Sequence, residues 1–296
     1  MSAPPPGWPH RAASHRIRCA PHDWHVQLFG QGPDLLLLHG AGASGHTWRH
    51  LVPLLSGFRL IVPDLPGQGF TRAGGRGRFG LEAMADDLAH LMHAEGWAPA
   101  AIIGHSAGAA IALRMSEILP VTPAALVGVN AALGPFEGFA GWLFPKLARA
   151  MAMSPIIAHA VAKMSAQRPR IERLIESTGS RLDAEGIELY RTLVARPAHV
   201  EATLGMMADW RLEPLLARLH QVRPPVLLIA SRGDRAVPPS VSRVAAARLP
   251  DVEYAEIATH GHLVHEEAPA AVAALLLPFL ARHLGPPRQS AAAGRA

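Results

Sequence analysis

The sequence has a single cysteine and no hydrophobic segment long enough to cross a bilayer. With one thiol, Cys19, no disulfide can form within the 296 residues, which is typical of proteins from a reducing compartment. The N-terminal stretch MSAPPPGWPHRAASHRIRC lacks the apolar core of a secretory signal. The apolar run AAVAALLLPFLA near the C-terminus is too short for a membrane span and contains Pro278, so it predicts a packed helix. These absences predict a cytoplasmic protein.

Lysine is scarce as well, because Lys146 and Lys163 are the only lysines among 28 basic residues. The formal net charge of +5 and the pI of about 10.3 therefore rest on arginine. The arginines are scattered and do not alternate with aromatic residues, so we expect a solvated basic surface and no nucleic-acid partner. Contact of this surface with an anionic membrane stays open. The chain also lacks the acidic cluster that magnesium binding requires.

Apolar runs and helical patterns alternate along the chain. Hydrophobic residues make up 49% of it, which is enough for a sizeable core. Buried strands are predicted at five apolar runs, which are DLLLLHG (34–40), FRLIVPDL (58–65), AAIIGHSAG (100–108), AALVGVNA (124–131) and PPVLLIASRGD (224–234). This alternation is typical of an α/β fold with a mostly parallel central sheet flanked by helices.

A long helical pattern between residues 133 and 211 interrupts the alternation. Because a strand resumes after it, we interpret it as a helical lid inserted after the sixth strand, between the core segments 21–132 and 212–284. The Pro-, Ala- and Arg-rich residues 1–20 predict a flexible N-terminal arm. The low-complexity tail, residues 285–296, is expected to be disordered.

The pentapeptide GHSAG (104–108) ends an apolar strand and opens a helical segment. In this context G-x-S-x-G predicts a nucleophile elbow, a tight turn that presents the serine above the sheet. Side chains at Gly104 and Gly108 would collide with the neighbouring strand and helix. The pattern predicts Ser106 as a nucleophile, with the N–H of Ala107 at the helix N-terminus facing a developing oxyanion.

A serine nucleophile needs a base, and the base needs a group that orients it. On a sheet of this kind, the order along the chain is serine, acid, histidine. Asp234 ends one of the predicted strands, and His262 lies in a loop before the last helix. We therefore predict Asp234 as the acid and His262 as the general base.

Other residues compete for these two roles. His260 and His265 flank the predicted base, and Asp209 and Asp251 are alternative acids, although neither follows a buried strand. Metal binding is a further alternative at three places, which are HGHLVH (260–265), His46/His50 and His90/His93. No carboxylate or cysteine completes the two pairs at a typical ligand spacing, so we predict neither a metal site nor a cofactor.

The stretch LLLLHGAGASG permits two interpretations. Gly40, Gly42 and Gly45 have the spacing G-x-G-x-x-G, and Asp64 follows about 20 residues later, which is typical of a dinucleotide-binding turn. In an acyl-transfer site, the same loop supplies the second oxyanion donor, here the N–H of Ala41. We favour the second interpretation, because the first leaves the predicted nucleophile, acid and base unexplained.

The lid and the loops around the serine supply the predicted substrate-binding residues. Methionine and aromatic side chains recur in the lid, where they either pack against one another or line a broad apolar pocket. His39 is expected to tie loops together beside the site. The predicted substrate-binding set is His39, Gly40, Gly42, His105, Trp142, Met206 and Met207.

Five segments resemble the α/β-hydrolase superfamily over about residues 24–284, and they are HGAGASGHTW, DLPGQGFT, GHSAGAA, SRGDRAVP and GHLVHEEAP. Other stretches resemble the magnesium-chelatase accessory proteins of bacteriochlorophyll biosynthesis in phototrophic bacteria. They are GWPHRAASHRI, VNAALGPFEGFAG and IESTGSRLDAEGIELYRTLVARPAHVEATLGMMADW. One departure is Gln68, where such proteins more often carry histidine.

The resemblance implies an α/β-hydrolase fold and a role near magnesium insertion into protoporphyrin, without naming a substrate. The serine-hydrolase chemistry predicted above requires no cofactor. Two functions stay open. The first is an esterase-like serine hydrolase acting on an apolar, tetrapyrrole-like ester. The second is a non-catalytic accessory protein that binds a porphyrin or magnesium-chelatase subunits. The predicted triad favours the first function, and peripheral contact with the photosynthetic membrane stays open in both.

Overall fold

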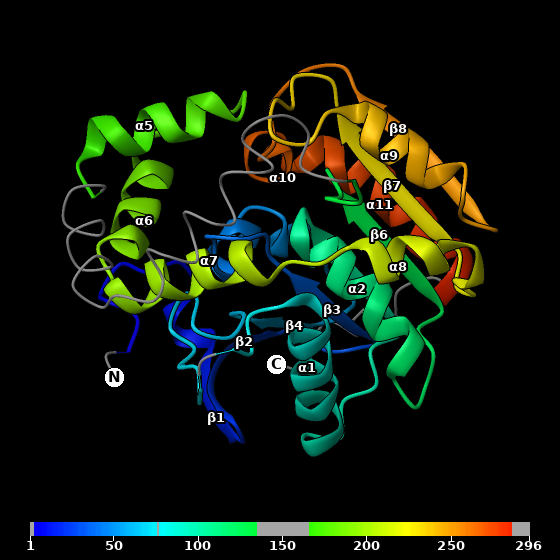
Figure 1. The fold of residues 1–296 in the computed structure, drawn as a ribbon, viewed down its shortest axis with the longest axis horizontal. Coiled ribbons are helices and arrows are strands. Elements are labelled where there is room, and N and C mark those ends of the chain that lie inside the picture. Colours follow the sequence, from blue (N-terminus) through cyan, green and yellow to red (C-terminus); the bar gives the residue numbers. More distant parts are fainter. Residues whose placement is uncertain (1–2, 76, 135–165, 286–296) are drawn as a thin grey trace, which may run out of the picture.

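The computed structural model describes residues 3–75, 77–134 and 166–285. Its centre is one sheet of eight strands, which are β1 (Ser14–Cys19), β2 (His22–Phe29), β3 (Asp34–Leu38), β4 (Arg59–Pro63), β5 (Ala101–His105), β6 (Ala125–Val129), β7 (Val226–Ser231) and β8 (Val252–Ile257). Their order across the sheet is β1-β2-β4-β3-β5-β6-β7-β8 (Figure 1). β2 pairs antiparallel with both β1 and β4, and all other neighbours are parallel. The predicted mostly parallel sheet is confirmed.

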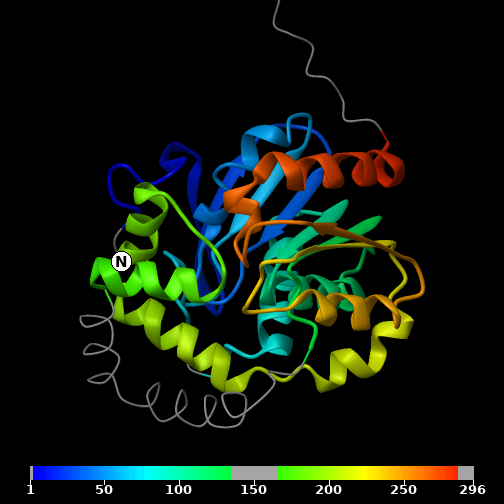
Figure 2. The same cartoon turned by 90° about the horizontal axis from the view of Figure 1, so that it is seen from above.

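The leucine run of β3 is buried because helices cover both faces of the sheet. Leu36 and Leu38 pack in the hydrophobic cluster that includes α1 (Leu81–Ala94) and α2 (Ala107–Ile118). Leu35 and Leu37 point to the opposite face, where α11 (Pro269–Leu284) packs. In Figure 2, α11 (red) and α2 (teal) lie on opposite sides of the sheet. Each buried leucine contributes about 1.5–3 kcal/mol to folding.

Most of the core helices connect strands, whereas α10 (Val264–Glu267) and α11 follow the last strand. α1 buries Leu81, Met84, Leu88 and Leu91, which recur every three or four residues and form one apolar face. The other core helices are α8 (Glu213–Arg218) and α9 (Pro239–Ala246). Short 3-10 turns are η1 (Arg11–Ala13), η2 (Gly45–Trp48), η3 (Val52–Leu54) and η4 (Leu219–Gln221).

The N-terminal segment differs from the predicted flexible arm. β1 pairs with β2 along its whole length, from Ser14 opposite Gln27 to Cys19 opposite His22. Upstream of it, Trp8 is only 4% exposed. The prediction of an arm over residues 1–20 is wrong here because an edge strand needs little apolar sequence. Its outward side chains are polar, and the ladder itself satisfies its backbone.

The lid is the part of the chain between β6 and α8. Its described helices are α5 (Arg168–Ser177), α6 (Ala184–Val194) and α7 (Pro197–Asp209), and they gather at one end of the molecule (Figures 1 and 2). The predicted helical insertion after the sixth strand is confirmed. We use the term helical cap for the described part of the lid, which consists of these three helices and the turns that connect them. Residues 135–165, which include Trp142, lie outside the described residues.

None of the helices in the described ranges combines the length and the apolar character that crossing a membrane requires.

Candidate active site

The predicted elbow has the backbone of a strained turn. Ser106 has φ 51° and ψ −116°, a conformation that L-residues rarely adopt, between the end of β5 and the first turn of α2. A Cβ at Gly104 would lie 2.3 Å from the carbonyl carbon of Gly108. A Cβ at Gly108 would lie 2.2 Å from the carbonyl oxygen of Leu38. The sharp turn therefore requires both glycines, as the sequence predicts.

Asp234 and His262 form a buried pair. Nδ1 of His262 donates to Oδ2 of Asp234 at 2.7 Å, and the Asp234 side chain is shielded from solvent. The other carboxylate oxygen, Oδ1, accepts the backbone N–H groups of Ala236 and Val237, each at 2.8 Å. These three donors fix the carboxylate, so it holds the imidazole with Nε2 left to act as a proton acceptor.

Ser106 and His262 line the same cavity. Within the described ranges, no hydrogen bond joins the Ser106 hydroxyl to His262. Such bonds are commonly long in the absence of substrate and tighten when substrate binds. The arrangement places a strained serine, a histidine and a fixed carboxylate in the chain order of a hydrolase triad.

The alternative acids and bases lie elsewhere. His260 is exposed, and its Nδ1 contacts the hydroxyl of Thr259 at 2.8 Å. His265 is completely buried behind the site, where its ring stacks on His105 with 4.2 Å between centroids. Asp251 is exposed at the turn before β8, and Asp209 ends α7. Of all these residues, the structure brings Asp234 and His262 together.

The loop after β3 lies against Ser106. A Cβ at Gly40 would lie 2.9 Å from Nδ1 of His105 and 3.1 Å from the Cβ of Ser106, so a larger residue would force these side chains to shift. The N–H of Gly42 donates to Oε1 of the buried Gln68 at 2.8 Å, which fixes the loop. The N–H of Ala41 finds no acceptor among the residues that the structure describes. The N–H of Ala107 is equally free of the helix ladder, because it belongs to the first turn of α2.

His39 has the loop-tying role expected from the sequence and does not line the cavity. Its Nδ1 donates to the carbonyl of Gly40 at 2.8 Å, and its Nε2 accepts the N–H of Leu65 at 2.9 Å. The ring is fully buried, and burial lowers the pKa of His39, so it stays neutral and can serve as donor and acceptor at once.

Asp64 excludes the dinucleotide interpretation of the same loop. Its carboxylate is 1% exposed and accepts from the N–H of Gly45 at 2.7 Å, the N–H of Phe70 at 2.8 Å, and Nδ1 of His25 at 2.8 Å. Burial alone would raise the pKa of Asp64, but the His25 imidazole and these donors bring it down to about 2. A carboxylate with all its partners inside the protein cannot bind a ribose.

The base loop, residues 258–263 between β8 and α10, is held by Asn130, which the sequence does not single out, and by His105. Asn130, which follows β6 with φ 45°, donates from Nδ2 to the carbonyls of Gly261 and His262 at 3.1 and 2.9 Å. His105, which was predicted to contact substrate, also donates from Nε2 to the carbonyl of His262 at 2.9 Å. Burial lowers the pKa of His105 well below its usual range, so it remains a neutral donor. The dipeptide VN at the end of β6 carries no local signal for this role.

The cavity above Ser106 measures about 510 Å³ and lies between the core loops and the helical cap. Apolar side chains form most of its wall, and the described lining residues include no Lys, Arg, Asp or Glu. Among the predicted substrate-binding residues, those that line it are Gly40, Gly42, His105, Met206 and Met207. Ser106, His262 and the loop after β3 thus face a space whose wall is mostly apolar.

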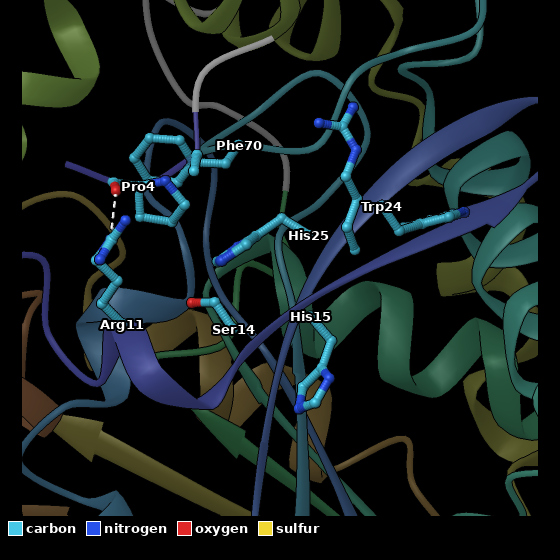
Figure 3. Close-up of a pocket in the computed structure, with 9 residues that line it drawn as sticks. Pro4, Arg11, Ser14, His15, Trp24, His25 and Phe70 are labelled. Atoms are coloured by element: carbon cyan, nitrogen blue, oxygen red, sulfur yellow. Dashed lines mark hydrogen bonds between the residues drawn. The ribbon is translucent and has the colours of Figure 1, made fainter.

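A second cavity of about 320 Å³ lies beside β1 and β2, and Figure 3 shows the side chains around it. Its wall includes Arg11, Ser14 and His25. Ser14 lies in ordinary extended backbone, with φ −79° and ψ 126°, and its Oγ accepts from Nε2 of Gln27 at 3.3 Å. Ser14 therefore lacks the strained strand-to-helix turn that presents Ser106.

Metal ligands do not converge in the described part of the chain, where no group of three or more His, Cys, Asp and Glu side chains could hold an ion. His46, one member of a suspected pair, is buried, and its Nδ1 contacts the hydroxyl of Ser44 at 2.7 Å.

A sequence model of the alpha/beta hydrolase fold matches residues 33–269, which include the elbow, the acid and the base. The chain belongs to the α/β-hydrolase family. This α/β hydrolase is 48% identical over 279 residues to the Magnesium-chelatase 30 kDa subunit of Rhodobacter capsulatus, a match that covers 93% of this chain and 97% of that protein. Both resemblances noted in the sequence are therefore confirmed.

More distant relatives of this α/β hydrolase include named enzymes. It is 31% identical over 239 residues to the pimeloyl-acyl-carrier-protein methyl ester esterase of Aromatoleum aromaticum, covering 78% of this chain and 91% of the esterase. An α/β hydrolase fold protein from Burkholderia ambifaria has the same fold, with a TM-score of 0.75 at 23% identity over 90% of this chain and 97% of that one. The esterase relative supports a hydrolase in general, and the Burkholderia structure shows the fold alone.

Proposed function

We propose that this protein is a serine hydrolase that cleaves a carboxylic ester bearing an apolar group. The observation that carries the proposal is the 2.7 Å hydrogen bond between His262 and Asp234 beside the cavity that Ser106 lines. A protein that only binds a ligand needs neither a strained serine nor an oriented base. Ser106 and His262 share the cavity, and the bond from His262 to Asp234 supports a common role for the three residues.

In the proposed reaction, Oγ of Ser106 attacks the ester carbonyl carbon while Nε2 of His262 takes the hydroxyl proton. The carbonyl oxygen becomes an oxyanion and accepts from the N–H groups of Ala41 and Ala107. His262 then returns the proton to the departing alcohol, leaving an acyl-enzyme. Water repeats the sequence with His262 as base, and the carboxylic acid and free Ser106 are released. Asp234 stabilises the imidazolium in both halves.

The cavity wall supports a neutral, apolar substrate. Charged groups of a ligand would lose hydration there without a described partner of opposite charge, which is costly. A tetrapyrrole-like ester, with its carboxylate masked, meets this condition better than a free porphyrin acid. The 48% identity to a protein named as a magnesium-chelatase subunit supports action near that enzyme and contact with its subunits.

That same name favours a second candidate, a non-catalytic accessory protein of the chelatase. The two candidates differ in whether the serine is needed. Treatment of the purified protein with a fluorophosphonate probe, beside the Ser106→Ala and His262→Ala variants, tests the first. We expect labelling of the wild type that is lost in Ser106→Ala and strongly slowed in His262→Ala. An unlabelled wild type at neutral pH would count against a competent triad.

The role in the pathway needs a separate measurement. Cells that lack this protein are complemented with wild-type or Ser106→Ala protein, and magnesium protoporphyrin formation is followed. If the hydrolase activity serves the pathway, only the wild type restores formation. Restoration by Ser106→Ala together with probe labelling of the wild type would favour the accessory role.

A further inference from the structure

Three glycines bring the helical cap into direct contact with the loops that carry the acid and the base. Gly179 follows α5, Gly233 precedes Asp234, and Gly261 precedes His262. A Cβ at Gly179 would lie 2.0 Å from the carbonyl oxygen of Gly233, and a Cβ at Gly261 would lie 2.2 Å from the carbonyl carbon of Gly179. The three backbones therefore touch with no room for side chains.

Hydrogen bonds cross the same contact. We define the cap turn as residues 178–181, between α5 and α6. The carbonyl of Thr178 accepts the N–H of Arg235 at 3.0 Å and the N–H of His262 at 3.3 Å. The hydroxyl oxygen of Ser180, which is fully buried, accepts the N–H of Leu263 at 2.8 Å. The cap turn thus bonds to the residue after the acid, to the base itself, and to the residue after the base.

Glu267, in α10 of the core, accepts hydrogen bonds from both the cap turn and the base loop. Its Oε1 accepts the N–H of Arg181 at 2.8 Å, and its Oε2 accepts the N–H of Gly261 at 3.0 Å. One carboxylate therefore clamps the cap turn and the base loop together.

We infer that the cap turn positions the acid and the base, and that Ser180 is a positioning residue for His262. This inference rests on the proposed hydrolase function. The loops of Asp234 and His262 come from different strands, and the carbonyl of Thr178 accepts one backbone N–H from each of them, while Ser180 holds the base side. Ser231 at the end of β7 adds a direct bond from its Oγ to the carbonyl of His260 at 2.9 Å. Without the Ser180 hydroxyl, the buried N–H of Leu263 loses its partner, and the base loop moves to recover one.

The test compares rates of fluorophosphonate labelling in the full-length protein. Ser180→Ala removes the acceptor, and Ser180→Thr keeps it. Asp183→Ala is the matched control, because Asp183 caps α6 by accepting the N–H of Gly186 at 2.7 Å and is exposed away from the triad. Loss of that cap weakens the same part of the helical cap without touching either catalytic loop.

We expect Ser180→Ala to label about tenfold more slowly, Ser180→Thr to recover most of the rate, and Asp183→Ala to label like the wild type. The proton shared by His262 and Asp234 gives a far-downfield NMR resonance, which we expect to weaken in Ser180→Ala alone. Labelling of Ser180→Ala at the wild-type rate with that resonance intact would overturn the inference, as would an equal loss in Asp183→Ala.

A second variant covers the case in which Ser180→Ala does not fold. Glu267→Gln lies on the core side and weakens one of the two clamping bonds, so we expect a smaller slowing of labelling in a folded protein. An unchanged rate there overturns the inference. An unlabelled wild type refutes the proposed function instead, so the two failures are distinguishable.

Discussion

Replacing Asp234 by asparagine tests the acid–base pair without removing volume. In the wild type, Oδ1 accepts two backbone N–H groups and Oδ2 accepts one from His262. An amide has one oxygen and one NH₂ group, so it cannot accept hydrogen bonds on both sides as the carboxylate does. Two backbone bonds of about 1 kcal/mol each outweigh one, so the amide oxygen stays on Ala236 and Val237 and the NH₂ group faces His262.

The consequence is the wrong tautomer of the base. With a donor facing it, Nδ1 of His262 must accept, so Nε2 carries the proton and cannot take one from Ser106. We expect labelling by the fluorophosphonate probe to slow by roughly 10³–10⁴-fold, while the free energy of unfolding changes by about 1–2 kcal/mol at most.

The assay is the second-order rate constant of labelling, measured beside urea unfolding of each variant. Asp251→Asn is the control, because Asp251 is an exposed aspartate and an alternative acid from the sequence. It should label like the wild type. Labelling of Asp234→Asn within tenfold of the wild type would refute the tautomer argument.

Three further outcomes follow from buried groups. Arg49→Met leaves the buried carboxylate of Glu266 without its ion pair and should lower the free energy of unfolding in urea by about 3–5 kcal/mol. The double variant Arg49→Met with Glu266→Leu should recover most of this loss. If the losses of the two single substitutions add up in the double variant, the pairing is contradicted. Gly108→Ala should fail to fold or lose labelling, because its Cβ meets the Leu38 carbonyl at 2.2 Å; a folded, fully labelled variant would contradict this. Burial lowers the pKa of His199 from 6.5 to about 4, so the unfolded chain binds its proton more tightly. The free energy of unfolding should therefore be at its full value at neutral pH and fall by about 3 kcal/mol toward pH 4. The fall should be less steep in His199→Gln, and unfolding curves with the same pH dependence in the wild type and this variant would contradict the argument.

The elements with dense local patterns were predictable from the sequence. The four leucines of β3 alternate between two covered faces, and GHSAG must turn sharply because of its glycines. Asp234 and His262 were predictable because the chain order of serine, acid and histidine leaves them as the acid after a buried strand and the base before the last helix. The geometry brings these two residues together as that reasoning expects.

What escaped prediction depends on contacts between distant segments. Asn130 holds the base loop from more than 100 positions away, and nothing in its neighbours indicates that role. β1 has few apolar residues, and its pairing with β2 decides its conformation. The cap turn belongs to neither catalytic loop in sequence and still contacts both. Local periodicity carries no information about such partners.

The contact among Gly179, Gly233 and Gly261 also bears on the order in which the protein folds. Each glycine comes from a different part of the chain, and their backbones meet only when the cap and the sheet are both in place. Contacts between segments far apart in sequence are costly to close and form late. A chain with a finished sheet and an undocked cap would be nearly folded and still inactive. For this protein, gain of activity would therefore report the last step of folding.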